Sequence, residues 1–156
     1  MQSRKKVRYD VDDDNPHFLI GMTFSNAKEV REALTKYAVA KGKDLRLKPN
    51  EPTRIRATCK AKGCPFVILI SNDGKDGGMC VKTLNPEHTC YRTFKNSRAT
   101  ADFLANHFKD KIYRNPKTTV KDLVNGAKAQ MRLNLSASIM KRAKKNLDRI
   151  RRELCG

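Results

Sequence analysis

Hydrophobic residues recur at the period of a helix between residues 26 and 42. The apolar positions stand three or four residues apart, at Val30, Ala33, Leu34, Tyr37 and Ala38. This period is typical of a helix that buries one face against the rest of a domain. Ser25 or Asn26 can cap its first turn, and Gly42 can end it. We therefore expect one helix here that packs on a neighbouring layer.

Shorter runs on either side of this helix have the period of strands. Polar and apolar residues alternate across residues 44–48 and again across residues 54–58, as they do where one face of a strand is buried. Residues 66–70 and 79–84 are apolar runs joined by a glycine-rich turn, and residues 18–24 form a strand-like entry. These patterns predict a small antiparallel sheet with the helix packed on it.

The last part of the chain, residues 93–156, shows helical periodicity only. Thr100 begins the first helix, and Asn115–Pro116 can end it. Thr119, with Asp122 three residues later, suits the start of the second helix, and Ser136 can cap the third. The three expected apolar stripes are Phe103, Leu104, Phe108 and Ile112; Val120, Leu123, Val124, Ala127 and Met131; and Ile139, Ala143, Leu147, Ile150 and Leu154. Three short helices with a tight turn before the last predict a helix-turn-helix-like bundle. The fold class is therefore α+β, a sheet domain followed by an all-α segment.

The first residues of the chain have no apolar periodicity. A basic triplet occupies residues 4–6, and an acidic triplet occupies residues 12–14. Such a stretch cannot bury enough apolar surface to fold by itself. We expect a disordered leader over residues 1–17, a first domain over residues 18–92 and the helical segment over residues 93–156.

Four residues of the first domain have the chemistry of metal ligands, namely Cys59, Cys64, His88 and Cys90. They form a C-x4-C pair and an H-x-C pair, separated by 23 residues that can form a hairpin and bring the pairs together. Three thiolates and one imidazole complete the tetrahedral set of a structural zinc site and leave no position for a catalytic water. We therefore predict one structural Zn²⁺; the alternative is a set of unconnected free cysteines and a surface histidine.

The charge of the chain points to a polyanionic partner. Lys and Arg number 34 against 16 Asp and Glu, which gives a net charge of +18. Nucleic acid is the obvious polyanion. No apolar stretch near 18 residues and no signal-peptide core occur, so a membrane is not expected as partner. Five cysteines without a secretory signal favour a reducing intracellular compartment.

Cations gather on one face of the two alternating runs. They are Arg46, Lys48, Arg54 and Arg56, and Lys43 stands just before the first run. We expect this face to contact duplex DNA; the alternative is an ordinary solvated face. The last predicted helix is basic as well, and we expect auxiliary phosphate contacts from Lys141, Arg142 and Lys145.

The run from residue 18 to residue 90 resembles the amino-terminal DNA-binding region of plant Mutator-like (MuDR-type) transposases. The segments that carry the resemblance are Phe18–Phe24, Lys36–Val39, Cys59–Phe66 and Val81–Cys90. Family members often have Trp where Phe66 stands. The ligand spacing is also similar to the WRKY-type zinc fold, an antiparallel sheet with zinc at one end. The heptapeptide WRKYGQK of that family is absent, and residues 43–48 occupy its place.

The resemblance implies a zinc-dependent module that binds transposon-end DNA in the nucleus. Residues 100–151 also resemble the helical segment that follows the zinc domain in these transposases. Their catalytic domain, a nuclease of the RNase H type, lies further along, so we expect this chain to be a fragment or a domesticated remnant without enzymatic activity. Two other functions stay open, a transcription regulator on host promoters and an RNA-binding protein. The sequence also leaves open whether the chain forms a homo-oligomer.

Overall fold

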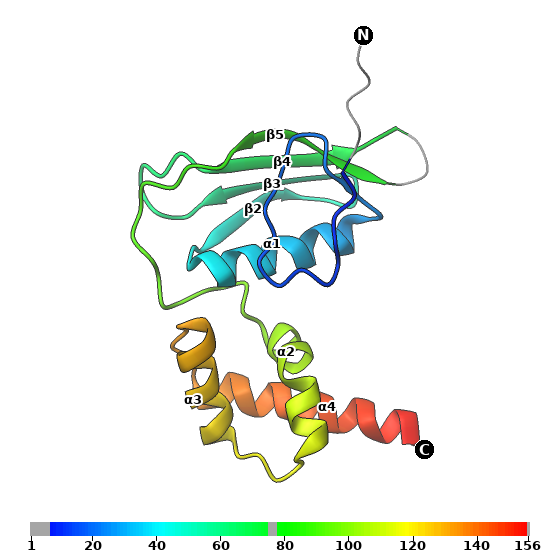
Figure 1. Ribbon diagram of the computed structural model, residues 1–156, viewed down its shortest axis with the longest axis vertical. Helices are drawn as coiled ribbons and strands as arrows, with labels where there is room; N and C mark the ends of the chain where they lie inside the picture. Colours follow the sequence, from blue (N-terminus) through cyan, green and yellow to red (C-terminus); the bar gives the residue numbers. More distant parts are fainter. Residues whose placement is uncertain (1–6, 75–77, 156) are drawn as a thin grey trace. The chain divides into compact units, whose positions relative to one another are not determined.

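The computed structural model describes residues 7–74 and 78–155 (Figure 1). The chain divides into two compact units, Met1–Arg92 and Thr93–Gly156. The first unit is a sheet with one helix, and the second contains helices only. This arrangement confirms the α+β fold class.

The sheet of the first unit has five strands in the order β1-β5-β4-β3-β2. They are β1 (Thr23–Phe24), β2 (Leu45–Asn50), β3 (Arg54–Cys59), β4 (Val67–Asn72) and β5 (Met79–Asn85). All four strand pairings are antiparallel, as the sequence predicts. Strand β2 forms one edge, so its outer backbone groups have no partner strand in the sheet.

The helix of this unit, α1 (Ala27–Lys41), covers one face of the sheet (Figure 1). The Asn26 side chain accepts a hydrogen bond from the backbone N–H of Glu29 and caps the first turn. Gly42 ends the helix with a φ of 66°, a conformation that costs glycine little. The predicted stripe is confirmed, because Val30, Ala33, Leu34, Tyr37 and Ala38 are all buried.

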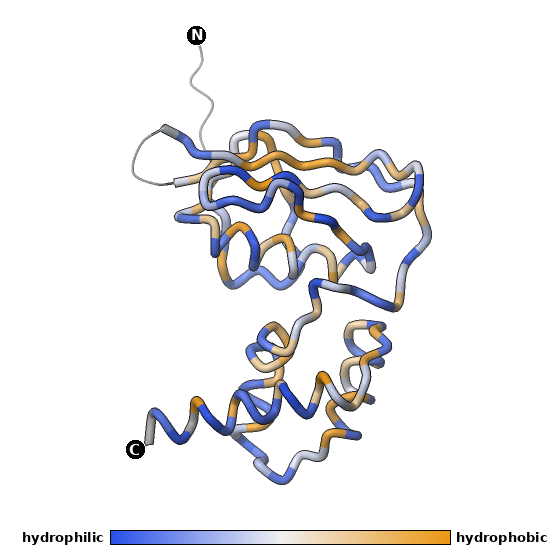
Figure 2. Tube along the Cα trace, turned by 180° about the vertical axis from the view of Figure 1, so that it is seen from behind, coloured by the Kyte–Doolittle hydropathy of each residue, from blue (hydrophilic) through white to orange (hydrophobic). Residues whose placement is uncertain are grey.

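The core of the first unit lies between this stripe and the covered face of the sheet. Its largest fully buried side chains include Leu34, Ile55, Phe66, Ile68 and Ile70, and Figure 2 shows the hydrophobic runs in the interior strands. Burying one such side chain stabilises a fold by about 1.5–3 kcal/mol. The aliphatic residues of β3 and β4 therefore hold α1 against the sheet.

Residues before the sheet depart from the predicted pattern in two places. In the expected strand over residues 18–24 the strand itself covers Thr23–Phe24, because Gly21 has a φ of 86° and turns the chain. In the expected leader, Tyr9 is only 4% exposed, and its ring centroid lies 5.0 Å from that of Phe24. One aromatic residue anchors this segment, and a single residue gives no periodicity. The basic triplet at residues 4–6 lies outside the described residues.

The second unit consists of α2 (Ala101–Arg114), α3 (Val120–Met131) and α4 (Ala137–Cys155). The predicted helix starts are confirmed, and the hydroxyls of Thr100, Thr119 and Ser136 accept backbone N–H groups of the first helical turns. Helix α4 packs against both α2 and α3.

The buried stripe of α4 differs from the prediction at both ends. Met140 is fully buried, as are Ala143 and Leu147, whereas Ile139 is only half-buried. The prediction that Ile150 points inward is wrong, because its side chain is 38% exposed. The cause is that α4 is longer than the surface it packs on, and its end extends past α2 (Figures 1 and 2). The predicted inward side chain of Leu154 lies outside the described side chains.

No helix in the described part of the chain combines the length and apolar character needed to cross a bilayer.

Candidate metal centre and nucleic-acid interface

The four predicted metal ligands lie at one end of the sheet because of the strand order. Cys59 is the last residue of β3, and Cys64 lies in the loop that leads into β4. His88 and Cys90 follow the end of β5. Strands β3 and β5 flank β4 and run antiparallel to it. Both strands therefore finish at the end of the sheet where β4 begins. The loop turns at Gly63, whose φ is 77°.

The ligand atoms are close enough to share one ion. All four lie within 4.8 Å of one another. The Sγ atoms of Cys59 and Cys90 are 3.6 Å apart, and His88 Nδ1 lies 3.3 Å from Cys64 Sγ and 4.0 Å from Cys90 Sγ. Tetrahedral zinc with its usual bond lengths separates such atoms by about 3.5–3.8 Å. Cys59, Cys64, His88 and Cys90 can therefore hold a metal ion with only small shifts.

Two thiols of the cluster have shifted pKa values. Burial raises the pKa of Cys59 to about 12; a hydrogen bond from the backbone N–H of Ala61 acts against this rise, and the neighbouring thiols of Cys90 and Cys64 add to it. Burial acts in the same direction on Cys64, but hydrogen bonds from the N–H groups of Phe66 and Thr89 lower its pKa to about 7. Thiolates bind metals and thiols do not, so a divalent cation would stabilise all of these sulfurs in the charged form.

His88 is oriented for metal binding by two aromatic residues. Its Nε2 lies 2.9 Å from the hydroxyl oxygen of Tyr37, and its ring stacks on Phe66 with centroids 4.4 Å apart. Nδ1 is left facing the thiols. Burial, followed by the charges of Lys43 and Lys41, lowers the pKa of His88 to about 4. The imidazole is thus neutral at pH 7, which is the form that ligates metals.

Tyr37 has a second role that the sequence did not reveal. Its helical position predicts a core residue, and it is buried, yet its hydroxyl supports a metal ligand from the opposite layer. Such outer partners fix the tautomer and orientation of ligating histidines. No local signal could have identified this partner, because 51 residues separate it from His88.

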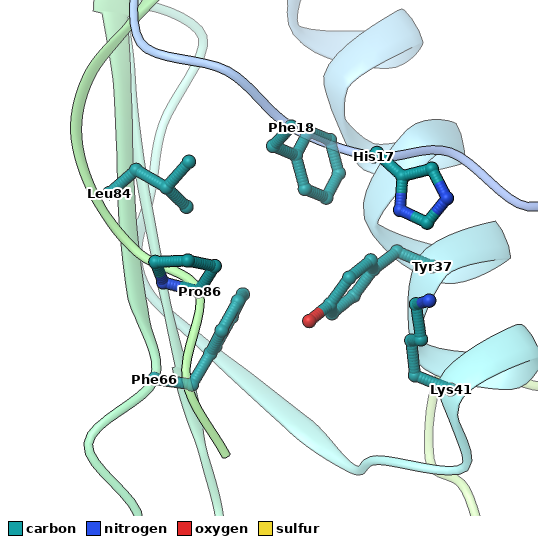
Figure 3. A pocket seen from close by; sticks show the side chains of 7 residues that line it. All are labelled: His17, Phe18, Tyr37, Lys41, Phe66, Leu84 and Pro86. Carbon is teal, nitrogen blue, oxygen red and sulfur yellow. The ribbon is translucent and has the colours of Figure 1, made fainter.

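A pocket is lined in part by Tyr37 and Phe66, the two aromatic residues that contact the candidate ligand His88. It is lined by His17, Phe18, Tyr37, Lys41, Phe66, Leu84 and Pro86. Figure 3 shows the Tyr37 hydroxyl directed toward Phe66 and Pro86, with His17 and Lys41 on the same side as Tyr37. The ring centroid of Tyr37 lies 5.2 Å from that of Phe18 and 5.3 Å from that of Phe66, so this aromatic packing helps to hold the two residues that orient His88.

The predicted cation cluster lies on the face of the sheet that α1 leaves uncovered. The exposed side chains of Arg46, Lys48, Arg54 and Arg56 alternate with Leu45, Leu47, Ile55 and Ala57, which face the core. Strands β2 and β3 are neighbours, so the four cations form one patch, named here the basic sheet face. Within the described part of the chain none of these four side chains takes part in an ion pair.

Lys43 lies beside the metal centre. Its Nζ donates a hydrogen bond to the backbone carbonyl of Cys90 over 2.7 Å, so this side chain ties the start of β2 to the second ligand pair. The other predicted contacts, Lys141, Arg142 and Lys145, are exposed on α4 in the second unit. The structure therefore gathers the four sheet cations on one face and puts three helical cations in a separate unit.

Comparison with known proteins identifies part of the chain. Residues 15–81 match the family model of a DNA-binding domain described as MuDR family transposase. No curated protein matches the chain. A solved structure described as "Crystal structure of AFT2 in complex with DNA" is similar at 18% identity and a TM-score of 0.42, over 70% of this chain and 92% of that chain. The family match confirms the resemblance to MuDR-type transposases in the segment that contains Cys59 and Cys64, and it ends before His88.

Proposed function

Because residues 15–81 match the DNA-binding domain of MuDR family transposases, we propose that the first unit is a zinc-dependent module that recognises double-stranded DNA at transposon ends. One observation carries the proposal. The sheet that gathers four candidate metal ligands at one end also exposes four cations on its uncovered face, and none of the four is in an ion pair with a described residue.

Zinc is the ion that this donor set favours. Three sulfurs and one imidazole nitrogen suit zinc, whereas magnesium and calcium take oxygen ligands. A bound zinc would cross-link the end of β3, the loop before β4 and the segment after β5. The four protein ligands fill its coordination sphere, so the ion would act in structure and would activate no water.

The basic sheet face supplies what DNA binding requires. Arginine on a rigid strand can reach phosphates and can also donate two hydrogen bonds to guanine, a contact worth about 1–3 kcal/mol of discrimination between bases. Strand β2 is an edge strand, so it can approach a groove without a neighbouring strand in the way. A two-stranded ribbon fits the major groove. We therefore assign Arg46 and Lys48 on β2 to the groove, and Arg54 and Arg56 on β3 to the phosphates beside it.

We also propose that the protein acts in the nucleus and has no catalytic step of its own. Duplex DNA as partner implies a nuclear location. Among the described residues, the Cys/His set is the one group of three or more potential ligands gathered closely enough for a metal. A two-metal nuclease needs carboxylates around two ions about 4 Å apart. We expect DNA binding without cleavage.

The test is a binding selection from random duplex DNA with zinc present, followed by affinity measurements on the selected site. The double variant Arg46→Ala, Arg56→Ala should lose about 10- to 100-fold in affinity, because it removes the groove contact of Arg46 and the phosphate contact of Arg56. It should also flatten the salt dependence, because fewer counterions are released when a phosphate contact is lost. The charge-matched control is Arg4→Ala, Lys5→Ala. Equal losses in both variants would reduce the interaction to diffuse charge attraction and refute the proposal. Selection of host promoter sequences over transposon ends would point to a transcription regulator.

A further inference from the structure

The second unit is more basic than the first, although the family match does not reach it. Residues 93–156 contain 16 Lys and Arg against 5 Asp and Glu, a net charge of +11, whereas residues 1–92 have a net charge of +7. The smaller unit thus carries more than half of the excess charge. A charge of that density attracts polyanions and opposes compaction of the unit.

Among the described side chains, α4 has five exposed cations, more than α2 with three or α3 with two. The exposed cations of α4 recur at spacings of one to four residues and follow one side of the helix; they are Lys141, Arg142, Lys145, Arg149 and Arg152. Two acids, Asp148 and Glu153, are exposed on the same helix. Among the described side chains of the second unit none of the five cations is in an ion pair. From Lys141 to Arg152 the row extends about 16 Å along the helix.

The opposite side of α4 is used for packing and not for charge display. Met140, Ala143 and Leu147 are buried, and Lys144 turns away from solvent to donate a hydrogen bond to the carbonyl of Thr118 over 2.7 Å. Asn146 donates to the Asp102 carboxylate of α2 over 3.2 Å. The apolar stripe and two polar contacts therefore fix α4 on α2 and α3, and its cationic side stays exposed.

This arrangement favours a phosphate backbone over a lipid surface. A helix that binds membranes buries its own apolar face in the bilayer, but the apolar face of α4 is already covered by α2 and α3. Ile150 is the large apolar residue that α4 exposes among its described side chains. Recognition by this surface must come from charge.

We propose that the solvent side of α4, formed by Lys141, Arg142, Lys145, Arg149 and Arg152, is a second DNA-binding surface that grips the phosphodiester backbone of a duplex without reading bases. It acts together with the basic sheet face on one DNA molecule, and to that extent it rests on the proposed function. Once one unit is bound, the covalent connection makes the second contact intramolecular, which raises the affinity for any duplex long enough for both.

The test compares two variants of the full chain with the same loss of charge. The α4 variant is Lys141→Gln, Lys145→Gln, Arg149→Gln, and the control is Lys109→Gln, Lys121→Gln, Lys128→Gln on the exposed sides of α2 and α3. Affinity is measured for a 12-base-pair and a 40-base-pair duplex over a range of salt concentrations. On the long duplex the α4 variant should lose about 10-fold or more, and its salt slope should fall by about 2.7 for three lost contacts. The control should change less than about 2-fold.

Three results would overturn the inference: equal losses in the two variants, no loss in the α4 variant, or tighter binding of the chain to phosphatidylserine vesicles or single-stranded RNA than to duplex DNA. Unchanged helical circular dichroism shows that the α4 variant is folded, since its three substitutions lie on the solvent side.

The three α4 substitutions are also introduced into the chain that already carries Arg46→Ala and Arg56→Ala. In that chain they should still lower the remaining DNA affinity and its salt slope. If the sheet variant, Arg46→Ala with Arg56→Ala, binds DNA normally and the α4 variant does not, the proposed function fails and the inference about α4 stands. If the sheet variant loses affinity and the α4 variant does not, the inference alone fails.

Discussion

The two units of this protein carry similar surfaces on very different interiors. The sheet unit displays its cations on strands, and its end gathers three cysteines and a histidine. The helical unit displays more charge, yet it is held by capped helices and an apolar stripe without any such cluster in its described part. The comparison teaches that net charge does not distinguish the two units in their expected need for a metal, whereas the Cys/His cluster does.

The largest expected difference between the units is their response to metal removal. Chelation, or the variants Cys59→Ser and Cys90→Ser, should unfold residues 43–90, because binding of structural zinc supplies about 10–16 kcal/mol in small domains. The helical unit should keep its circular dichroism. Metal analysis of protein prepared with zinc should give one ion per chain; a value near zero, or intact sheet signals in both variants, would remove the basis of the comparison.

A core substitution should have the converse effect. Leu147 is buried in the helical unit, so Leu147→Ala should destabilise that unit by about 2–5 kcal/mol and leave the zinc content unchanged. Ile150→Ala removes the same kind of side chain from the same helix at a position that is 38% exposed, and it should cost far less. Thermal unfolding followed at a helical wavelength measures both. Equal costs would mean that Ile150 is covered in solution.

Tyr37→Phe tests whether the core of the sheet unit and its metal centre are coupled. Loss of the hydroxyl leaves His88 Nε2 without its partner, and loss of such an outer contact typically weakens metal binding by about 10- to 100-fold. Tyr9→Phe is the matched control, since the buried Tyr9 hydroxyl has no hydrogen-bond partner among the described residues. Competition with a chromogenic chelator measures the affinity. An unchanged affinity in Tyr37→Phe would reduce Tyr37 to a packing residue.

The smallest effect concerns the end of α1. Gly42 has a φ of 66°, and a Cβ there would come within 2.5 Å of the Arg92 guanidinium, which donates to the carbonyl of Ala40. Gly42→Ala should cost about 1–2 kcal/mol from backbone strain, plus the displacement of Arg92. Gly21→Ala, with a φ of 86° and no atom within 4 Å, carries the strain alone. Denaturant titration of the two variants separates these contributions; identical costs would show that Arg92 moves freely.

Much of this architecture follows from local sequence patterns. The helical period between Val30 and Ala38 predicts α1, and the alternation in β2 and β3 predicts which side chains face solvent. Caps such as Thr100 and Thr119 mark helix starts, because the hydroxyl and the N–H group that it accepts are only three residues apart. The metal ligands could be predicted as two close pairs for the same reason.

The sequence by itself thus determined the ligand set, the elements and the sign of the surface, because each depends on residues that are near one another in the chain. Tertiary structure decided what depends on distant neighbours. The strand order brought the two ligand pairs to one end of the sheet, and the packing of α1 put Tyr37 beside His88. The packing of Tyr9 on Phe24 gave the expected leader a place in the core. Ile150 fits the helical period of the buried stripe and is nevertheless exposed, because α4 extends beyond the helices that would have buried it. Periodicity along one helix carries no information about the length of the surface on which that helix packs.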